Sequence, residues 1–277
     1  MTIKINNTDI RIRPSAVDTF FQCSYQWGKV FLEGITSIPN SRAAIGTSIH
    51  AAAEVYWTEA IKRGDKEDTN LSALIDAGVE AWKEEEQKGM RYGDGENQNT
   101  CTAEIITGTS TFVDDIVPFS KIPDGVEKFF TVKIDHQLVT ELGGTVDYIS
   151  NTTIADLKTG KRKASVRNYT TQQSIYRYLA QENGINVQNN LIQNVVLKKV
   201  PEGQILGMPT NVPQAKHLIN SMLDTLDLVL MDVVPVETIL RGNPKYYLCS
   251  EKYCALYSTC PFIKEEAPEA VKPGVKL

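Results

Sequence analysis

Apolar positions recur with a helical period in the first part of the chain and with strand-like alternation from about residue 125 onward. Helical spacing predicts helices over Pro14–Gly34, Thr47–Lys62, Leu71–Gln87, Tyr169–Glu182 and Val212–Val229. Alternation and β-forming residues predict strands over Lys128–Leu138, Gly143–Ser150, Thr153–Lys158 and Leu191–Lys199. The Gly- and Asn-rich stretch Lys88–Thr100 is predicted to be a loop. This order of elements favours an α/β fold with a mixed central sheet flanked by helices.

The length of 277 residues allows one large domain. We expect a single domain over residues 1–264, with a helical part at about 14–120, a catalytic sheet core at about 125–200, and a C-terminal helix with a cysteine-rich segment at about 211–264. The last residues, 265–277, are polar and carry two prolines, so a disordered tail is predicted there.

Composition narrows the class of protein. Hydrophobic residues make up 42% and charged residues 23%, and no apolar run reaches the ~20 residues that a membrane-spanning helix needs. The first residues lack the apolar core of a secretory signal, so we expect a cytoplasmic protein. The net charge of −5 argues against a nonspecific DNA coat protein, but it is compatible with an enzyme whose carboxylates hold metal ions.

The most informative pattern is an acid followed, nine residues later, by an acid and a lysine. Asp147 ends the segment Gly-Thr-Val-Asp, and Asp156-Leu157-Lys158 lies in the next predicted strand. Alternation puts Asp156 and Lys158 on one face of that strand and Leu157 on the other. If the two strands pair, Asp147 approaches the same place, and converging carboxylates call for a divalent cation such as Mg²⁺ or Mn²⁺. A hairpin with solvent-facing charges is the alternative.

Two further segments with recognisable patterns lie before and after the acid–lysine pattern in the chain. The sequence Gly-Thr-Ser-Ile-His ends at His50 upstream, and Tyr169, Gln172 and Tyr176 share one helix face downstream. Taken alone, each segment is compatible with ordinary packing. Together with the acid–lysine pattern, they resemble the PD-(D/E)XK nucleases, specifically the RecB-like branch that includes AddB and the CRISPR-associated exonucleases.

The resemblance implies a restriction-endonuclease-like sheet and a metal-dependent DNA exonuclease that hydrolyses phosphodiester bonds with two Mg²⁺ or Mn²⁺ ions. In that family pattern Asp147, Asp156 and His50 are the protein ligands, and the backbone carbonyl of Leu157 contributes as well. Lys158 then orients or helps to deprotonate the attacking water, and it stabilises charge on the phosphate.

The resemblance also indicates where DNA binds. The family motif assigns DNA contacts and support of the lysine to Tyr169, Gln172 and Tyr176. A basic run beside the active strand adds candidate phosphate contacts, although a solvated loop is its alternative: Lys161, Arg162, Lys163 and Arg167. Glu127, at the start of the preceding strand, is an outer residue of the site or a contact to the DNA end.

Five cysteines are present, an odd number that argues against a disulfide framework. Cys249, Cys254 and Cys260 lie close together near the C-terminus, and Cys23 lies on the first predicted helix. Some RecB-like nucleases carry one leading and three trailing cysteines that bind a 4Fe-4S cluster, so the resemblance implies a structural iron-sulfur site here. Zinc, whose usual paired C-x-x-C spacing is missing, comes second, and buried free thiols come third. Cys101 is left as an unassigned free thiol.

The partners follow from the same resemblance. DNA is the expected substrate, and a recombinase, a helicase or a CRISPR-type protein is a candidate protein partner, with a role in phage or prokaryotic DNA processing, recombination or repair. A phage-encoded protein would act in the host cytoplasm. Two other classes stay open: a noncatalytic DNA-binding or recombination partner that retains the nuclease fold, and a zinc-stapled scaffold protein.

Overall fold

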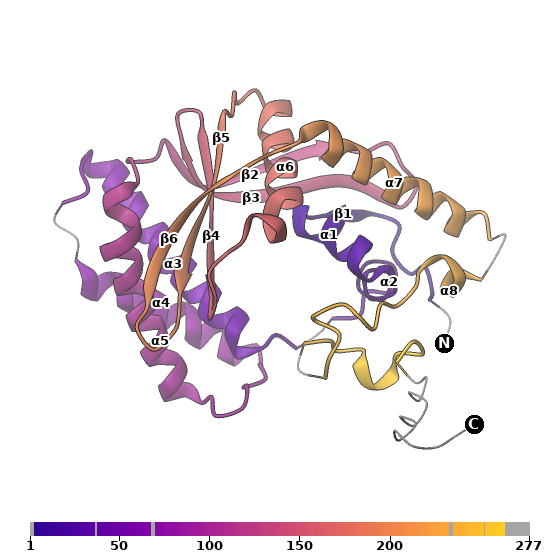
Figure 1. Cartoon of the computed structure of the whole chain (residues 1–277), viewed down its shortest axis with the longest axis horizontal. Coiled ribbons are helices and arrows are strands. Elements are labelled where there is room, and N and C mark those ends of the chain that lie inside the picture. The colour runs from indigo at the N-terminus through magenta and orange to yellow at the C-terminus, as the bar shows by residue number, and fades with distance from the viewer. Residues whose placement is uncertain (1–2, 37, 68–69, 233–234, 252, 264–277) are drawn as a thin grey trace, which may run out of the picture.

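The computed structural model describes residues 3–36, 38–67, 70–232, 235–251 and 253–263. The predicted disordered tail at 265–277 lies outside these ranges. Helices and strands both contribute to the fold, in a mixed α/β arrangement with the sheet at its centre (Figure 1).

The helices fall into an N-terminal group, one helix between strands, and a C-terminal group. They are α1 (Pro14–Gln22), α2 (Ser24–Phe31), α3 (Ser41–Arg63), α4 (Leu71–Gln87), α5 (Gln98–Thr111), α6 (Val166–Glu182), α7 (Val212–Leu230) and α8 (Val236–Ile239), with short π- and 3₁₀-turns at Phe112–Ile116, Val117–Phe119 and Tyr257–Thr259. The strands are β1 (Ile10–Ile12), β2 (Gly125–Lys133), β3 (Val139–Ser150), β4 (Thr153–Gly160), β5 (Asn189–Val196) and β6 (Glu202–Met208).

The sheet is mixed, which confirms the predicted fold class. Its strand order is β1-β3-β4-β5-β6, and β2 pairs with β3. The pairs β1/β3 and β4/β5 are parallel, whereas β2/β3, β3/β4 and β5/β6 are antiparallel.

Strand β3 forks the sheet. One edge of β3 pairs with β2 along most of its length. The other edge pairs with β1 at Val139–Leu142 and with β4 only at Tyr148–Ser150. Residues 143–147 between these two short ladders therefore have no strand partner on that edge within the described structure. The fork opens at the segment that ends in Asp147.

Two hydrophobic cores cover the two faces of the sheet. One core, around Trp27, Ile154 and Leu179, lies against α1, α2, α6 and α7. The second, around Trp57, Trp82 and Leu157, lies under α3, α4 and α5 (Figure 1). Ile154 belongs to the first core and Leu157 to the second, as the strand alternation predicts.

Capping side chains set the start of three N-terminal helices. Asn40, Asn70 and Asn97 each accept a hydrogen bond from a backbone N–H of the first turn, at the starts of α3, α4 and α5. Asn40 caps α3, which begins at Ser41, six residues before the predicted start at Thr47. Asn97 starts α5 inside the predicted loop Lys88–Thr100, so the last part of that loop prediction is wrong.

The predicted helix Pro14–Gly34 is also wrong as a single element. The backbone at Cys23 is extended, with φ −157° and ψ 87°, so α1 ends at Gln22 and α2 begins at Ser24. Apolar spacing continues through the break, which hides it from a periodicity argument. The break turns Cys23 toward the C-terminal segment, as described below.

Strands β1 and β6 were not predicted, and β2, β3, β5 and α6 each begin two to four residues before their predicted starts. Among the described residues, none of the helices combines the length and apolar character required to cross a membrane.

Candidate functional site

The acid pair of the sequence pattern lies at the fork of the sheet. The last rung of the β3/β4 ladder joins Tyr148 to Ala155, so the next residues along the two strands are Asp147 and Asp156. The backbone N–H of Leu157 donates a hydrogen bond to Asp147 Oδ2 at 2.6 Å. This bond holds the carboxylate of Asp147 across the opening of the fork.

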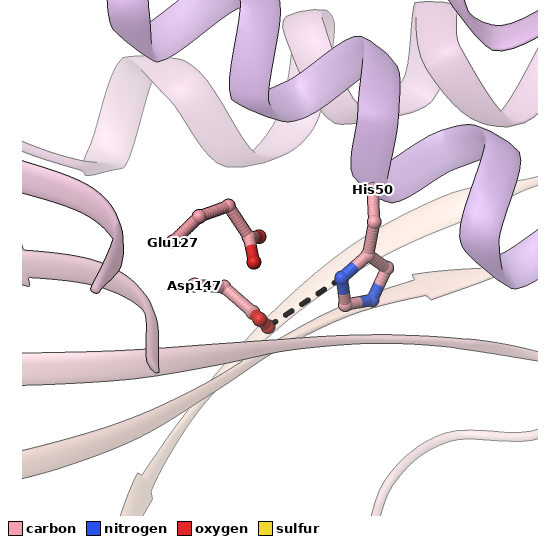
Figure 2. A group of neighbouring side chains, drawn as sticks. All are labelled: His50, Glu127 and Asp147. Carbon is pink, nitrogen blue, oxygen red and sulfur yellow. Dashed lines mark ion pairs between the residues drawn. The ribbon is translucent and has the colours of Figure 1, made fainter. Parts of the chain in front are cut away.

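Three side chains from three elements converge there. His50 of α3, Glu127 of β2 and Asp147 of β3 offer ligand atoms that all lie within 4.8 Å of one another. Figure 2 shows these side chains pointing toward a common centre, with His50 Nδ1 3.6 Å from Asp147 Oδ2. An imidazole nitrogen and two carboxylates are a ligand set that suits a divalent cation.

Glu127 is placed in this group by an unusual backbone. Its neighbours Val126 and Lys128 pair with Tyr148 and Val146, so Glu127 lies opposite Asp147 in the ladder. Its φ of 46° is a left-handed conformation that a glutamate in a strand rarely adopts. Sequence reasoning assigned Glu127 an outer role. The structure brings it as close to the ligand group as His50.

The electrostatics of this group favour the binding of protons or of a cation. Burial, together with the charge of Asp156, raises the pKa of Asp147 to about 7. Burial, together with the charge of Asp147, raises the pKa of Glu127 to about 7. Burial also lowers the pKa of His50, which leaves its ring neutral and able to coordinate. A divalent ion would relieve the repulsion between these carboxylates.

Asp156 and Lys158 form an ion pair beside the ligand group. Lys158 Nζ lies 2.6 Å from Asp156 Oδ2, and the Asp156 side chain is only 6% exposed. Burial alone would lower the pKa of Lys158, but Asp156 and Asp147 outweigh it and raise the pKa above its ordinary value. The lysine therefore keeps its charge. Asp156 lies outside the group of three, although its charge acts on the pKa of both Asp147 and His50.

The backbone carbonyl of Leu157, which the sequence predicts as a ligand, lies next to His50. A hydrogen bond between His50 and the backbone of Leu157 acts to raise the pKa of His50, against the larger effect of burial. The short distance between α3 and β4 makes this contact possible. Gly46 has no side chain, and a Cβ atom there would lie 3.0 Å from Thr159 Oγ1. His50 follows one turn later on α3. A hollow of about 440 Å³ opens at this point, lined by Gly46, His50, Glu54 and Glu127 among others.

Helix α6 packs beside Lys158 on the face of the sheet opposite to α3. Lys158 Nζ lies 5.5 Å from the ring centre of Tyr169. Gln172 and Tyr176 are nearly buried, at 9% and 8% exposure, and they hydrogen-bond to each other. Burial, together with the charge of Asp156, raises the pKa of Tyr176 to about 12. Their burial favours the supporting part of the predicted role over extensive contact with DNA.

The basic run beside β4 divides into paired and unpaired cations. Lys161 forms an ion pair with Glu104, and Lys163 forms one with Glu202. Arg162 and Arg167 are exposed and have no ion-pair partner within the described part of the chain. The two arginines are therefore the better candidates for phosphate contacts.

Four of the five cysteines come together in a pocket that is separate from the ligand group. Cys23, Cys249, Cys254 and Cys260 line one pocket, with Tyr25, Tyr246, Leu256 and Phe262 among its other walls. Cys101 lies instead in the core under α3–α5, at 1% exposure. Burial raises the pKa values of Cys249, Cys254 and Cys260, and the neighbouring cysteines raise them further.

A mixed sheet forked around acids, a histidine and a lysine is the arrangement that the sequence pattern predicts for a nuclease. In agreement, the family model described as the PD-(D/E)XK nuclease superfamily matches residues 11–261. The chain belongs to the PD-(D/E)XK nuclease superfamily.

Comparison of structures supports the fold. A protein from Eubacterium rectale, described as a candidate exonuclease, superposes with a TM-score of 0.56 at 12% sequence identity. The match covers 82% of this chain and 85% of the other. At that identity the likeness concerns the fold alone. A search of curated protein sequences found no significant match.

Proposed function

We propose that this protein is a DNA exonuclease of the RecB-like branch, using Mg²⁺ or Mn²⁺ in a two-metal-ion type of hydrolysis. A role in phage or prokaryotic DNA processing, recombination or repair is part of the proposal. The observation that carries it is the convergence of His50, Glu127 and Asp147 beside the Asp156–Lys158 pair. A module that only binds DNA has no use for a buried lysine paired with an acid at a cation site.

The residues divide the work as follows. His50, Glu127 and Asp147 would hold one cation, and Asp156, on the neighbouring strand, would complete the coordination. A bound divalent ion supplies Lewis acidity to the scissile phosphate and lowers the pKa of water. The N–H of Leu157 fixes the direction of the Asp147 carboxylate.

Lys158 acts as a fixed positive charge. Because Asp156 and Asp147 raise its pKa, the metal-free protein keeps Lys158 protonated at neutral pH, which favours orientation of the water over its deprotonation. Its ammonium group can orient the attacking water and donate to a phosphate oxygen as negative charge develops there. Tyr169 and Asp156 hold Nζ between them, which limits the freedom of the side chain.

The test is digestion of end-labelled DNA in Mn²⁺ and in chelator. Asp156→Ala and Lys158→Ala should each lower the rate at least roughly a hundredfold without loss of the folded state. Lys83→Ala, which removes an exposed lysine of α4 paired with Glu80, is the matched control and should cut normally. Wild-type protein that binds DNA but never cuts it would instead indicate the noncatalytic DNA-binding partner.

We also propose that the four-cysteine pocket binds a 4Fe-4S cluster. The residues fit such a group, because four thiols from opposite ends of the sequence line one largely apolar pocket. Bound thiolates would tie the break between α1 and α2 to the C-terminal segment. The role is structural, since the pocket and the fork use different residues.

Spacing favours the cluster over zinc. Four thiolates around one zinc ion at ~2.3 Å place the sulfur atoms roughly 3.8 Å apart. Among the residues that the structure describes, the one group of three or more metal-ligating side chains within 4.8 Å of one another is that of His50, Glu127 and Asp147. The cysteine sulfurs are therefore spread more widely than a zinc site requires.

Anaerobic purification tests the cluster. We expect brown protein, an absorbance band of the iron-sulfur type, and about four irons per chain. Cys254→Ser should lose colour and iron, whereas Cys101→Ser should keep both. Colourless protein with one zinc per chain would support the zinc-stapled alternative, and metal-free wild-type protein with a normal melting temperature would contradict both.

A further inference from the structure

An exposed tyrosine stands out on the cysteine segment. Tyr247 is 78% exposed, although its neighbours Tyr246 and Cys249 both face the cysteine pocket. Isolated apolar side chains at a surface are common. Tyr247 differs because it is held in place and lies next to elements of the candidate active site.

Two consecutive turns fix the backbone around Tyr247. The N–H of Tyr246 donates to the carbonyl of Asn243 at 3.0 Å, and the N–H of Cys249 donates to the carbonyl of Tyr246 at 2.8 Å. The rings of Tyr246 and Tyr247 meet edge to face, with centres 5.0 Å apart. The exposed ring therefore projects from a turn with a defined conformation.

The same turns are fastened to the N-terminal helices. Asn243 Nδ2 donates to the carbonyl of Gln22 at 2.9 Å, and the N–H of Arg241 donates to Ser24 Oγ at 2.9 Å. The C-terminal segment runs beside α1 and α2 in Figure 1. Helix α1 in turn packs on α6, where Asp18 and Thr171 hydrogen-bond through their side chains.

This arrangement brings Tyr247 toward the start of α6. The hydrogen bond from Asn243 to the end of α1, together with the packing of α1 on α6, sets the turn of Tyr247 on the side of α6 that carries Tyr169, and the two phenol groups lie within electrostatic range of each other. Tyr169 is the residue whose ring lies against Lys158 Nζ. An aromatic series thus leads from the catalytic lysine to the exposed ring.

Exposed positive charges lie close to both tyrosines in the sequence. Lys245 and Arg167 are exposed, and neither has an ion-pair partner in the described ranges. Lys245 lies two residues before Tyr247, and Arg167 two residues before Tyr169. Aromatic rings interleaved with cations are the combination that binds single-stranded nucleic acid, with bases stacked on rings and phosphates near the cations.

We propose that Tyr247 and Tyr169 form a stacking platform for the bases of a single-stranded DNA end, which they hold beside Lys158. The inference rests on the proposed nuclease function and adds its substrate class. In a duplex each internal base is stacked on both sides and a blunt end exposes only the outer face of its last pair, so an unpaired end offers more free base faces to the platform. Lys245 and Arg167 bind the phosphates of that end.

The test compares Tyr247→Ala, Tyr247→Leu, Tyr247→Phe and Tyr247→Trp on a single-stranded oligonucleotide and on a blunt duplex. Loss of one stacked base should raise KM for the single strand roughly 5- to 150-fold in the Ala and Leu variants, with kcat nearly unchanged. Phe and Trp keep a ring and should restore KM. Phe119→Ala removes an aromatic side chain that is 80% exposed outside this segment, and it should leave KM unchanged.

Melting temperature and iron content separate stacking from folding. A Leu variant with normal iron and stability but a raised KM supports the platform, and rescue by Phe rules out a purely structural effect. Equal KM for the Leu and Phe variants, or a wild-type preference for blunt duplex, would overturn the inference while the nuclease stands. Wild-type protein that cuts neither substrate would remove the proposed function itself.

Discussion

The buried negative charge of Asp147 lowers the free energy of unfolding of the metal-free protein by a measurable amount. An acid whose pKa is raised in the folded state destabilises that state once it ionises. For Asp147, with a pKa of about 7, this cost is absent well below pH 4 and complete above pH 7. The variant Asp147→Asn keeps the size of the side chain and an oxygen that accepts from the N–H of Leu157, but it removes the charge.

The magnitude follows from the size of the pKa change. Raising a carboxyl pKa from 3.8 to about 7 corresponds to roughly 4 kcal/mol at pH 8. Glu127 and Asp156 share the repulsion, so protonation of Glu127 in the wild type relieves part of it. We expect Asp147→Asn to raise the free energy of unfolding by about 1–3 kcal/mol, or the melting temperature by roughly 3–10 °C.

Thermal unfolding in metal-free buffer and in Mn²⁺, at pH 5 and pH 8, checks this reasoning. At pH 8 without metal the variant should melt above the wild type, and at pH 5, which lies between the unfolded pKa of 3.8 and the folded pKa of about 7, the gap should shrink to roughly half or less. Added Mn²⁺ should stabilise the wild type far more than the variant, which has lost a ligand. A variant that melts below the wild type at pH 8 without metal would refute the account of a strained, buried charge.

Three more outcomes are expected. Glu127 and Asp147, with pKa values near 7, must lose their protons to bind metal. The apparent Mn²⁺ affinity should therefore fall by up to about tenfold per pH unit below 7 for each proton displaced. Titration calorimetry showing equal affinity at pH 6 and pH 8 would contradict this. Glu127→Gln should raise the Mn²⁺ concentration for half-maximal cutting at least roughly tenfold, and an unchanged requirement would return Glu127 to an outer role. Arg162→Ala combined with Arg167→Ala should lower the salt slope of DNA binding by about 1–2, whereas Lys161→Ala combined with Lys163→Ala, already paired, should change it less; equal slopes in binding titrations would count against the assignment.

The acid–lysine part of the site could be predicted because it is local. Strand alternation fixes the faces of Asp156, Leu157 and Lys158, and a two-residue turn brings the neighbouring strand back beside them. The mixed sheet followed from the same alternation. The helix carrying His50 was predicted from its spacing, although its start at Asn40 was missed.

The rest depends on contacts between distant residues. Strand β1 has only three residues and exists because it pairs with β3, more than a hundred positions away. Strand β6 carries two glycines and lacks regular alternation. The left-handed backbone of Glu127 and the extended backbone of Cys23 are imposed by the surrounding fold. None of these features leaves a periodic trace in the sequence.

Because Gly46 has no side chain, α3 can lie close to β4 beside the ligand group. The distance between α3 and β4 fixes the position of the His50 imidazole relative to the carboxylates of Glu127 and Asp147. It thereby sets the size of ion that all three side chains can contact. Mg²⁺ needs contacts of about 2.0–2.1 Å, and Ca²⁺ needs about 2.3–2.6 Å. A methyl group at position 46 would lie 3.0 Å from Thr159 Oγ1, so that side chain or α3 must move by a few tenths of an ångström, and a movement of α3 away from β4 would favour the longer contacts of a larger ion.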